Sequence, residues 1–330
     1  MRTLLIFLCS WCCLSTCFAT RALYGPGAGN RIVWVAPYST EVFDARLEKV
    51  IVNVNLIPKD QVEERISYVT EQFLESPYLL GALGEGPIGM FDQGPLYRTD
   101  AFDCLTFVST VVALVSSNNI DDFKKRINKI RYRDGVPNYA RRNHFVSLDW
   151  NRNNQRLGAV QDVTAKVVGD PASVKFAEAF INKKKWYKKK QASHLRLQTK
   201  PDKRYRDWLL DQFHGTSHKV NNENSRIAYL PLTLLFDDVD NPVQEVWDRI
   251  PSGSIVEIVR PNWNLIHEIG TRLNVSHLGF VVRTPQGLMY REASAVHGKV
   301  VDVPLIKYLR SAKHVKDIAG INIQQVQVEW

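Results

Sequence analysis

The pattern of apolar and polar positions is most distinctive at residues 99–115 (TDAFDCLTFVSTVVALV), where a long apolar run contains neither Gly nor Pro. Its many β-branched residues are compatible with a strand, but the length of the run favours a buried helix. Asp103 stands where a side chain can accept the N–H groups of a first helical turn. The pattern therefore predicts a buried helix that begins at Cys104 and has Asp103 as its N-cap.

Other segments show shorter periodic patterns. Residues 61–74 carry apolar side chains at helical spacing with charges between them, which predicts an amphipathic helix. The charged residues 121–130 are also read as a helix, and the apolar segment 227–236 is assigned to the core. Residues rich in β-branched side chains predict three later strands, at 254–259, 275–282 and 288–294.

Residues 284–287 (TPQG) predict a hairpin turn between the last two strands. Symmetric pairing about this turn sets Arg283 opposite Leu288 and Gly279 opposite Glu292. The same register sets His277 opposite Ser294. Because alternate residues of a strand share a face, Glu292 and Ser294 are predicted on the face of His277.

The composition, with 45% hydrophobic residues in 330, indicates a soluble globular protein of one or two domains. The formal net charge of +9 indicates an anionic partner or surface. Residues 183–206 are strongly basic and include three aromatic residues. We expect this segment to be attracted to an anionic wall polymer or a membrane surface, or to be a solvated helix face. Nucleic acid is not expected because the chain is predicted to be exported.

The N-terminus predicts that export. A basic residue, a short apolar run and small residues up to Ala19 are typical of a signal peptide cleaved near that position. A membrane anchor or a lipidated N-terminus is the less favoured alternative. Four of the five cysteines lie before the cleavage point, so Cys104 is the thiol that remains. A single thiol in an oxidising compartment, periplasmic or extracellular, favours a catalytic role over an inert buried one.

A catalytic reading of Cys104 needs a base. His277 is the candidate, because Glu292 or Ser294 on the same face can orient its imidazole. A structural histidine is the alternative. The residues 132–150 mix arginine, histidine and aromatic side chains in a loop, which suits a ligand with carboxylates or sugar faces, or is an ordinary surface loop. The glycine-punctuated loop 76–89 offers Tyr78 as a wall of the site or as a packing aromatic.

Several motifs occur in the order seen in a known family: SPYLLGALGEG, FDCLTFV, YRDGVPNYARRNHFVSLDW, IPSGSIVEIV, VSHLGFVV and REAS. Over residues 66–309 the chain resembles the N-acetylmuramoyl-L-alanine amidase-like proteins of the NlpC-type, papain-like cell-wall hydrolases. The resemblance implies an α+β fold with the Cys helix packed on an antiparallel sheet that carries the His. It also implies hydrolysis of the amide between N-acetylmuramic acid and L-alanine in peptidoglycan or muropeptides, without a metal or other cofactor.

Carried onto this sequence, the resemblance makes Cys104 the nucleophile and His277 the base. Related enzymes usually read His-Ala-Ser at residues 292–294, whereas this chain has Glu-Ala-Ser, so the third catalytic residue is open between Glu292 and Ser294. The expected substrate-binding residues are Tyr78, Asp103, Arg141, His144 and Trp150.

The expected organisation is a signal peptide at 1–19, an N-terminal arm at 20–60 and a cysteine amidase domain at 61–330. A basic insertion is expected at about 183–206. Two other functions are kept beside the amidase: an endopeptidase that cuts within the stem peptide, and a non-catalytic wall-binding protein on an amidase scaffold.

Overall fold

The computed structural model describes residues 33–330. The predicted signal peptide at 1–19 lies outside the described residues, as does the first part of the predicted arm. None of the helices formed by residues 33–330 combines the length and the apolar composition that crossing a bilayer requires.

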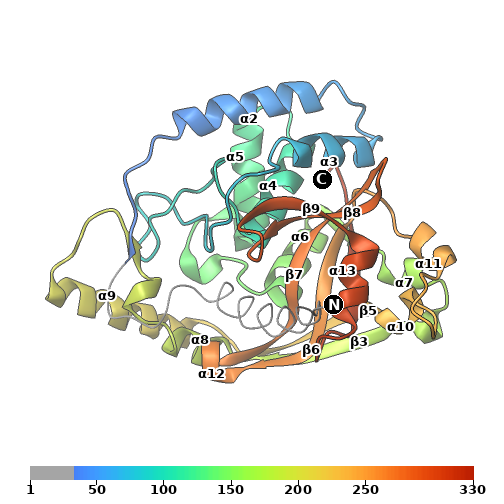
Figure 1. The fold of residues 1–330 in the computed structure, drawn as a ribbon. Coiled ribbons are helices and arrows are strands. Elements are labelled where there is room, and N and C mark those ends of the chain that lie inside the picture. Colours follow the sequence, from blue (N-terminus) through green and yellow to red (C-terminus); the bar gives the residue numbers. More distant parts are fainter. Residues whose placement is uncertain (1–32) are drawn as a thin grey trace, which may run out of the picture.

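An antiparallel sheet of eight strands forms the centre of the molecule (Figure 1). The strand order is β3-β5-β10-β6-β7-β8-β9, and β2 pairs with β10. The strands predicted at 254–259, 275–282 and 288–294 are confirmed as parts of β6, β7 and β8. The bounds are β2 Val160–Asp162, β3 Lys175–Ile181, β5 Glu223–Pro231, β6 Ile255–Leu265, β7 Thr271–Thr284, β8 Gly287–Ser294, β9 Lys299–Pro304 and β10 Gly320–Val326, with a separate parallel pair of β1 Val33–Trp34 and β4 Arg196–Leu197.

Four helices cover one face of this sheet (Figure 1). They are α2 Glu41–Val54, α3 Val62–Glu71, α4 Cys104–Ser116 and α5 Ile120–Arg131. Nearly every residue of α4 is buried, as expected of a helix that is apolar all round. Leu278 and Phe280 of β7 pack in the same core. The predicted helices at 61–74 and 121–130, and the choice of helix over strand after Cys104, are confirmed.

Helix α2 corrects the assignment of residues 20–60 to an arm. Leu47, Val50, Ile51 and Val54 are buried in the core beside α4. Their spacing of three and four residues places them on one helical face. Residues 41–54 therefore belong to the folded domain.

Short helices cover the other face of the sheet, and α13 stands in front of it in Figure 1. Their core includes Val281 of β7 and Tyr290 of β8. The apolar segment 227–236 is buried here as predicted, divided between β5 and α10. With helices on an antiparallel sheet, the fold is α+β, as expected. The helices of this layer are α7 Thr164–Val168, α10 Leu232–Leu235, α11 Gln244–Asp248 and α13 Leu305–Ala312.

A third group of elements packs together at one end of the sheet, where Figure 1 shows α8, α9 and α12. Its core contains Trp186 and Tyr187 from the basic segment 183–206, together with Tyr139. That segment is thus part of the domain's packing. The elements of this group are α8 Lys183–Lys188, α9 Lys203–Gly215, α12 Ile266–Ile269 and the short turns η2 Tyr139–Arg141, η3 Val146–Trp150, η5 Ala192–His194 and η6 Thr216–Lys219. The remaining short elements are α6 Asn151–Arg156, η1 Arg133–Gly135 and η4 Pro171–Ser173.

Candidate active site

The start of α4 is held by the N-cap that the sequence predicts. An Asp103 carboxylate oxygen accepts the N–H of Thr106 at 2.8 Å, and the Thr106 hydroxyl accepts the N–H of Asp103 at 2.9 Å. This reciprocal pair is a capping box. The second Asp103 oxygen accepts the N–H of Gly81 at 2.9 Å, which ties the glycine-rich loop to the helix. Cys104 is consequently fixed as the first residue of the helix, and it is a free thiol.

Tyr78 lies against this helix start. Its neighbour Leu79 donates its N–H to the carbonyl of Phe102 at 2.9 Å, and Phe102 donates to the carbonyl of Pro77 at 3.0 Å. Burial raises the pKa of Tyr78 above its usual value, and the charges of Cys104, Asp103 and Glu292 raise it further. Tyr78 is therefore a protonated wall of the site next to the sulfur.

His277 stands beside an irregularity in its strand. Ile258 of β6 pairs with His277, but the next residue, Val259, pairs with Val275, so Ser276 is an extra residue on β7. Such bulges bend a strand and re-aim the neighbouring side chains. The Nε2 atom of His277 hydrogen-bonds the carboxylate of Glu292.

The charge state of His277 follows from its neighbours. Burial, the largest effect, lowers its pKa. Against this, the charge of Glu292 and hydrogen bonds to Cys104 and Glu292 raise the pKa, and together they set it at about 10. The imidazole is thus held as a cation between a sulfur and a carboxylate.

Gly279 makes room for this pair. A Cβ at this position would lie 2.8 Å from the carbonyl oxygen of Arg291 and 3.1 Å from the Cβ of Glu292. The centres of the Tyr290 and His277 rings lie 5.9 Å apart, and the two rings pack edge to face at an angle of 84°. Sequence reasoning did not identify Tyr290, which carries no chemical signal beyond its aromatic side chain.

The predicted hairpin register is confirmed near the turn, from Thr284–Gly287 to Phe280–Arg291. The ladder does not extend to the predicted pair of His277 and Ser294. The Oγ of Ser294 hydrogen-bonds Nδ1 of His297 at 3.0 Å, in the connection between β8 and β9. The regular ladder between β7 and β8 ends at Phe280–Arg291, before it reaches His277. Glu292 is the residue that contacts His277.

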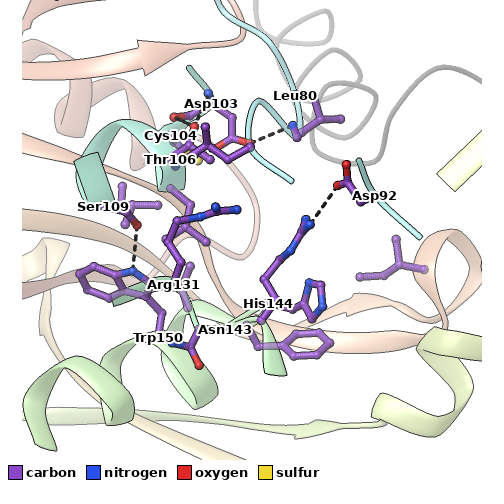
Figure 2. A pocket seen from close by; sticks show the side chains of 18 of the residues that line it. Leu80, Asp92, Asp103, Cys104, Thr106, Ser109, Arg131, Asn143, His144 and Trp150 are labelled. Atoms are coloured by element: carbon purple, nitrogen blue, oxygen red, sulfur yellow. Dashed lines mark hydrogen bonds and ion pairs between the residues drawn. The ribbon is translucent and has the colours of Figure 1, made fainter. Parts of the chain in front are cut away.

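A cavity of about 630 Å³ opens beside these residues (Figure 2). Tyr78, Asp103, Cys104 and His277 line it, as do the predicted residues His144 and Trp150. Trp150 is almost fully buried and donates its indole N–H to the Oγ of Ser109 at 3.1 Å, as Figure 2 shows. Because it is almost fully buried, Trp150 mainly supports the wall of the cavity and offers little open contact surface.

Arg141, a predicted substrate-binding residue, lines a smaller neighbouring pocket together with Arg142 and His144. Arg141 lies outside the cavity beside Cys104, partly exposed, and pairs with Asp134 at 3.4 Å. Its neighbour Arg142 lines that larger cavity instead and contacts the carboxylates of Glu85 and, at 2.9 Å, Asp92. The helical turn η2 ends at Arg141, so consecutive side chains there point in different directions.

His144 is held neutral in the cavity wall. Its Nε2 donates to the carbonyl of Tyr139 at 2.8 Å. Burial, followed by the charge of Arg142, keeps the pKa of His144 well below its usual value. Sequence reasoning did not place the charged residues Asp92, Arg131, Arg196 and Lys190 in the lining of this site. Asp92 stands in a Gly-rich stretch, which was the available signal.

Among residues 33–330 no group of three or more His, Cys, Asp or Glu side chains is placed to hold a metal ion. The site offers a thiol at a helix N-terminus, an imidazole beside it and a carboxylate behind the imidazole. Such a set can form a thiolate–imidazolium pair and can attack a carbonyl carbon.

Comparison with known proteins identifies the family of the chain. A family model described as N-acetylmuramoyl-L-alanine amidase-like matches residues 68–318. A Legionella pneumophila protein of the family model DUF1460 is 38% identical, with a TM-score of 0.82 over 87% of this chain and 95% of that one.

Two Bacteroides structures share the fold. A Bacteroides uniformis N-acetylmuramoyl-L-alanine amidase is 22% identical, with a TM-score of 0.54 over 81% of this chain and 99% of that one. A putative xylanase from Bacteroides fragilis is 24% identical, with a TM-score of 0.52 over 78% and 98%. No curated protein matches the chain.

Proposed function

Because the chain belongs to the N-acetylmuramoyl-L-alanine amidase-like family, we propose that it is a cysteine hydrolase of the cell wall. The proposed reaction is hydrolysis of the amide bond between N-acetylmuramic acid and L-alanine in peptidoglycan or muropeptides. The observation that carries the proposal is the contact of His277 with both Cys104 and Glu292 at the wall of one cavity.

In the proposed mechanism His277 holds the proton of the Cys104 thiol, and the thiolate attacks the lactyl carbonyl carbon of the muramic acid. The first turn of α4 has N–H groups without acceptors inside the helix, and these can stabilise the oxyanion. The Tyr78 hydroxyl is a further donor beside the sulfur. When the tetrahedral intermediate collapses, the C–N bond breaks and His277 protonates the leaving amine of L-alanine. Water then hydrolyses the thioester and restores the thiol.

The order of these groups along the chain supports an NlpC-type, papain-like arrangement. Cys104 begins a buried helix, His277 follows on a strand, and Glu292 follows on the next strand. In this proposal Glu292 fixes the ring of His277 and stabilises its charged form, as the third group of such triads does. Because the substrate belongs to the cell wall, the proposal includes export to the periplasm or beyond.

The basic segment 183–206 supports a role for anionic surfaces of the wall or membrane. It holds eleven Lys or Arg residues and one Asp, so the remaining chain, with 32 basic and 33 acidic residues, is nearly neutral. Four lysines of this segment are exposed on or next to α8: Lys184, Lys185, Lys188 and Lys189. We expect retention on wall material that weakens as salt is raised, because screening acts on exposed charges.

Digestion of a defined muropeptide tests the proposed reaction. The wild-type protein and the variant Cys104→Ala are each incubated with the muropeptide, and the product masses are measured. Intact stem peptide with a free L-alanine amine, produced only by the wild type, is the expected result. A shortened stem still attached to the sugar would support the endopeptidase alternative. Absence of turnover would support the non-catalytic alternative.

A further inference from the structure

One wall of the cavity carries more cations than anions. Arg131, Arg142, Arg196 and Lys190 line it, together with Asp92. The carboxylate of Glu85 stands behind Arg142. Arg98 and Asp103 also line the cavity, so five basic side chains stand against three acidic ones when Glu85 is included. A cleft with an excess of one charge attracts ligands of the opposite charge.

The three arginines of this wall are already engaged by the protein. Arg142 is bound by Glu85 and Asp92, and Arg196 contacts Asp92 at 3.3 Å. Arg131 donates to the carbonyl of Leu96 at 3.1 Å. Their donors are committed to these partners, so the arginines supply a fixed positive field rather than a free hydrogen-bonding group.

Lys190 differs from them. In residues 33–330 no carboxylate lies within ion-pair distance of its ammonium group, which sits 3.8 Å from the centre of the Trp186 ring. The Trp186 ring packs in turn on His144, with 4.7 Å between the ring centres. Burial, and after it the charge of Arg142, lowers the pKa of Lys190 to about 7. An aromatic face holds the amine from one side and leaves its N–H donors without an anionic partner.

Lys190 and the reacting sulfur occupy different parts of one cavity. Cys104 comes from α4, whereas Lys190 follows α8. Figure 2 shows His144, which packs on Trp186, on a different side of the cavity from Cys104. A ligand that contacts both the sulfur and Lys190 must therefore extend across the cavity.

We propose that Lys190 is a specificity-determining residue that binds a carboxylate of the peptide part of the substrate. This inference rests on the proposed function. In a muropeptide the lactyl carboxyl is consumed in the scissile amide, so the free carboxylates belong to the peptide. A peptide carboxylate on Lys190 would complete the hydrogen bonding of the ammonium and offset the excess positive charge of the wall.

The test compares two muropeptides that differ only in whether the peptide carboxylates are free or converted to carboxamides. The wild type is expected to prefer the carboxylate form by about tenfold in kcat/KM, the size of one charge-assisted hydrogen bond. Lys190→Met, which keeps the apolar contact with Trp186, is expected to lose this preference. Lys188→Met removes an exposed charge from α8 and is the matched control, which should retain the preference. Thermal unfolding of each variant verifies that it is folded.

A binding measurement separates this inference from the proposed function. Calorimetric titration of the Cys104→Ala protein with the two muropeptides measures affinity without turnover. A preference for the carboxylate form that Lys190→Met removes and Lys190→Arg retains supports the assignment, even if the wild type hydrolyses neither compound. Equal binding or no binding of the two compounds, or a preference that persists in Lys190→Met, overturns it.

Discussion

Glu292 on β8 hydrogen-bonds Nε2 of His277 on β7, and its charge helps to raise the pKa of that imidazole to about 10. Because burial alone would lower this pKa, the carboxylate decides which protonation state the site holds. The pair links the local fold of the hairpin to the chemistry proposed for Cys104.

The first prediction concerns the pH dependence of activity. In the wild type, kcat/KM should fall on the alkaline side as His277 loses its proton, near pH 10. The variant Glu292→Gln can still form a hydrogen bond but carries no charge. Since the charge raises the pKa of His277, its removal should move the alkaline limb to lower pH. A pH profile of kcat/KM for both proteins measures this, and an unmoved limb would show that Glu292 does not set the charge of His277.

The second prediction concerns the space beside His277. Gly279→Ala places a Cβ against the backbone of Arg291 and the side chain of Glu292. We expect a loss of stability of about 1–3 kcal/mol from overpacking. We also expect kcat to fall in protein that is still folded, because β8 carries Glu292. Gly215→Ala is the control, since a Cβ there meets nothing within 4 Å. Denaturant unfolding and kinetics provide the two readouts, and wild-type values of both for Gly279→Ala would contradict the role of this close contact.

A third prediction concerns Glu257, a fully buried carboxyl in β6. Asn151 donates to one of its oxygens at 3.0 Å, and the other oxygen has no partner among the described residues. Burial raises the pKa of Glu257 to about 8, well above its usual 4.5. The stability contributed by this group is therefore complete below about pH 4.5 and is lost as the pH rises through about 8.

Replacement by Glu257→Gln removes this ionisation. The difference in melting temperature, variant minus wild type, should increase by a few degrees between pH 5 and pH 9. About 1 kcal/mol of stability shifts Tm by about 2–4 °C. Glu48→Gln, on the exposed side of α2, should show no such trend. A constant difference across this pH range would contradict the raised pKa.

A fourth prediction concerns the start of helix α4. Asp103→Ala removes the acceptor for Thr106 and for Gly81 together. A lost N-cap costs about 0.5–2 kcal/mol. Asp103→Asn keeps an acceptor at the cap and should retain most of the stability. Chemical denaturation of both variants measures this difference, and equal losses would indicate that the charge, rather than the cap, is what matters.

The predictions from sequence succeeded where the determinants are local. Asp103 defines the first turn of α4 within four residues, and the TPQG turn fixes the nearby pairing of β7 and β8. Distant contacts could not be predicted. The ladder between β7 and β8 ends at Phe280–Arg291, short of the predicted pair of His277 and Ser294. A single turn places Arg142 rather than Arg141 in the lining of the cavity beside Cys104. Trp186 lies among lysines in the sequence, so its burial was not expected. It packs against His144, which is more than forty residues earlier in the chain.

In the proposed mechanism the Cys104 sulfur becomes acylated by the muramic acid part of a muropeptide. Mass spectrometry of the Cys104-containing peptide, after turnover is stopped with acid, measures this directly. We expect a mass increase that corresponds to the N-acetylmuramoyl group, and no such adduct with a substrate whose amide has been replaced by an uncleavable bond. An unmodified Cys104 peptide, together with full turnover by Cys104→Ala, would contradict it.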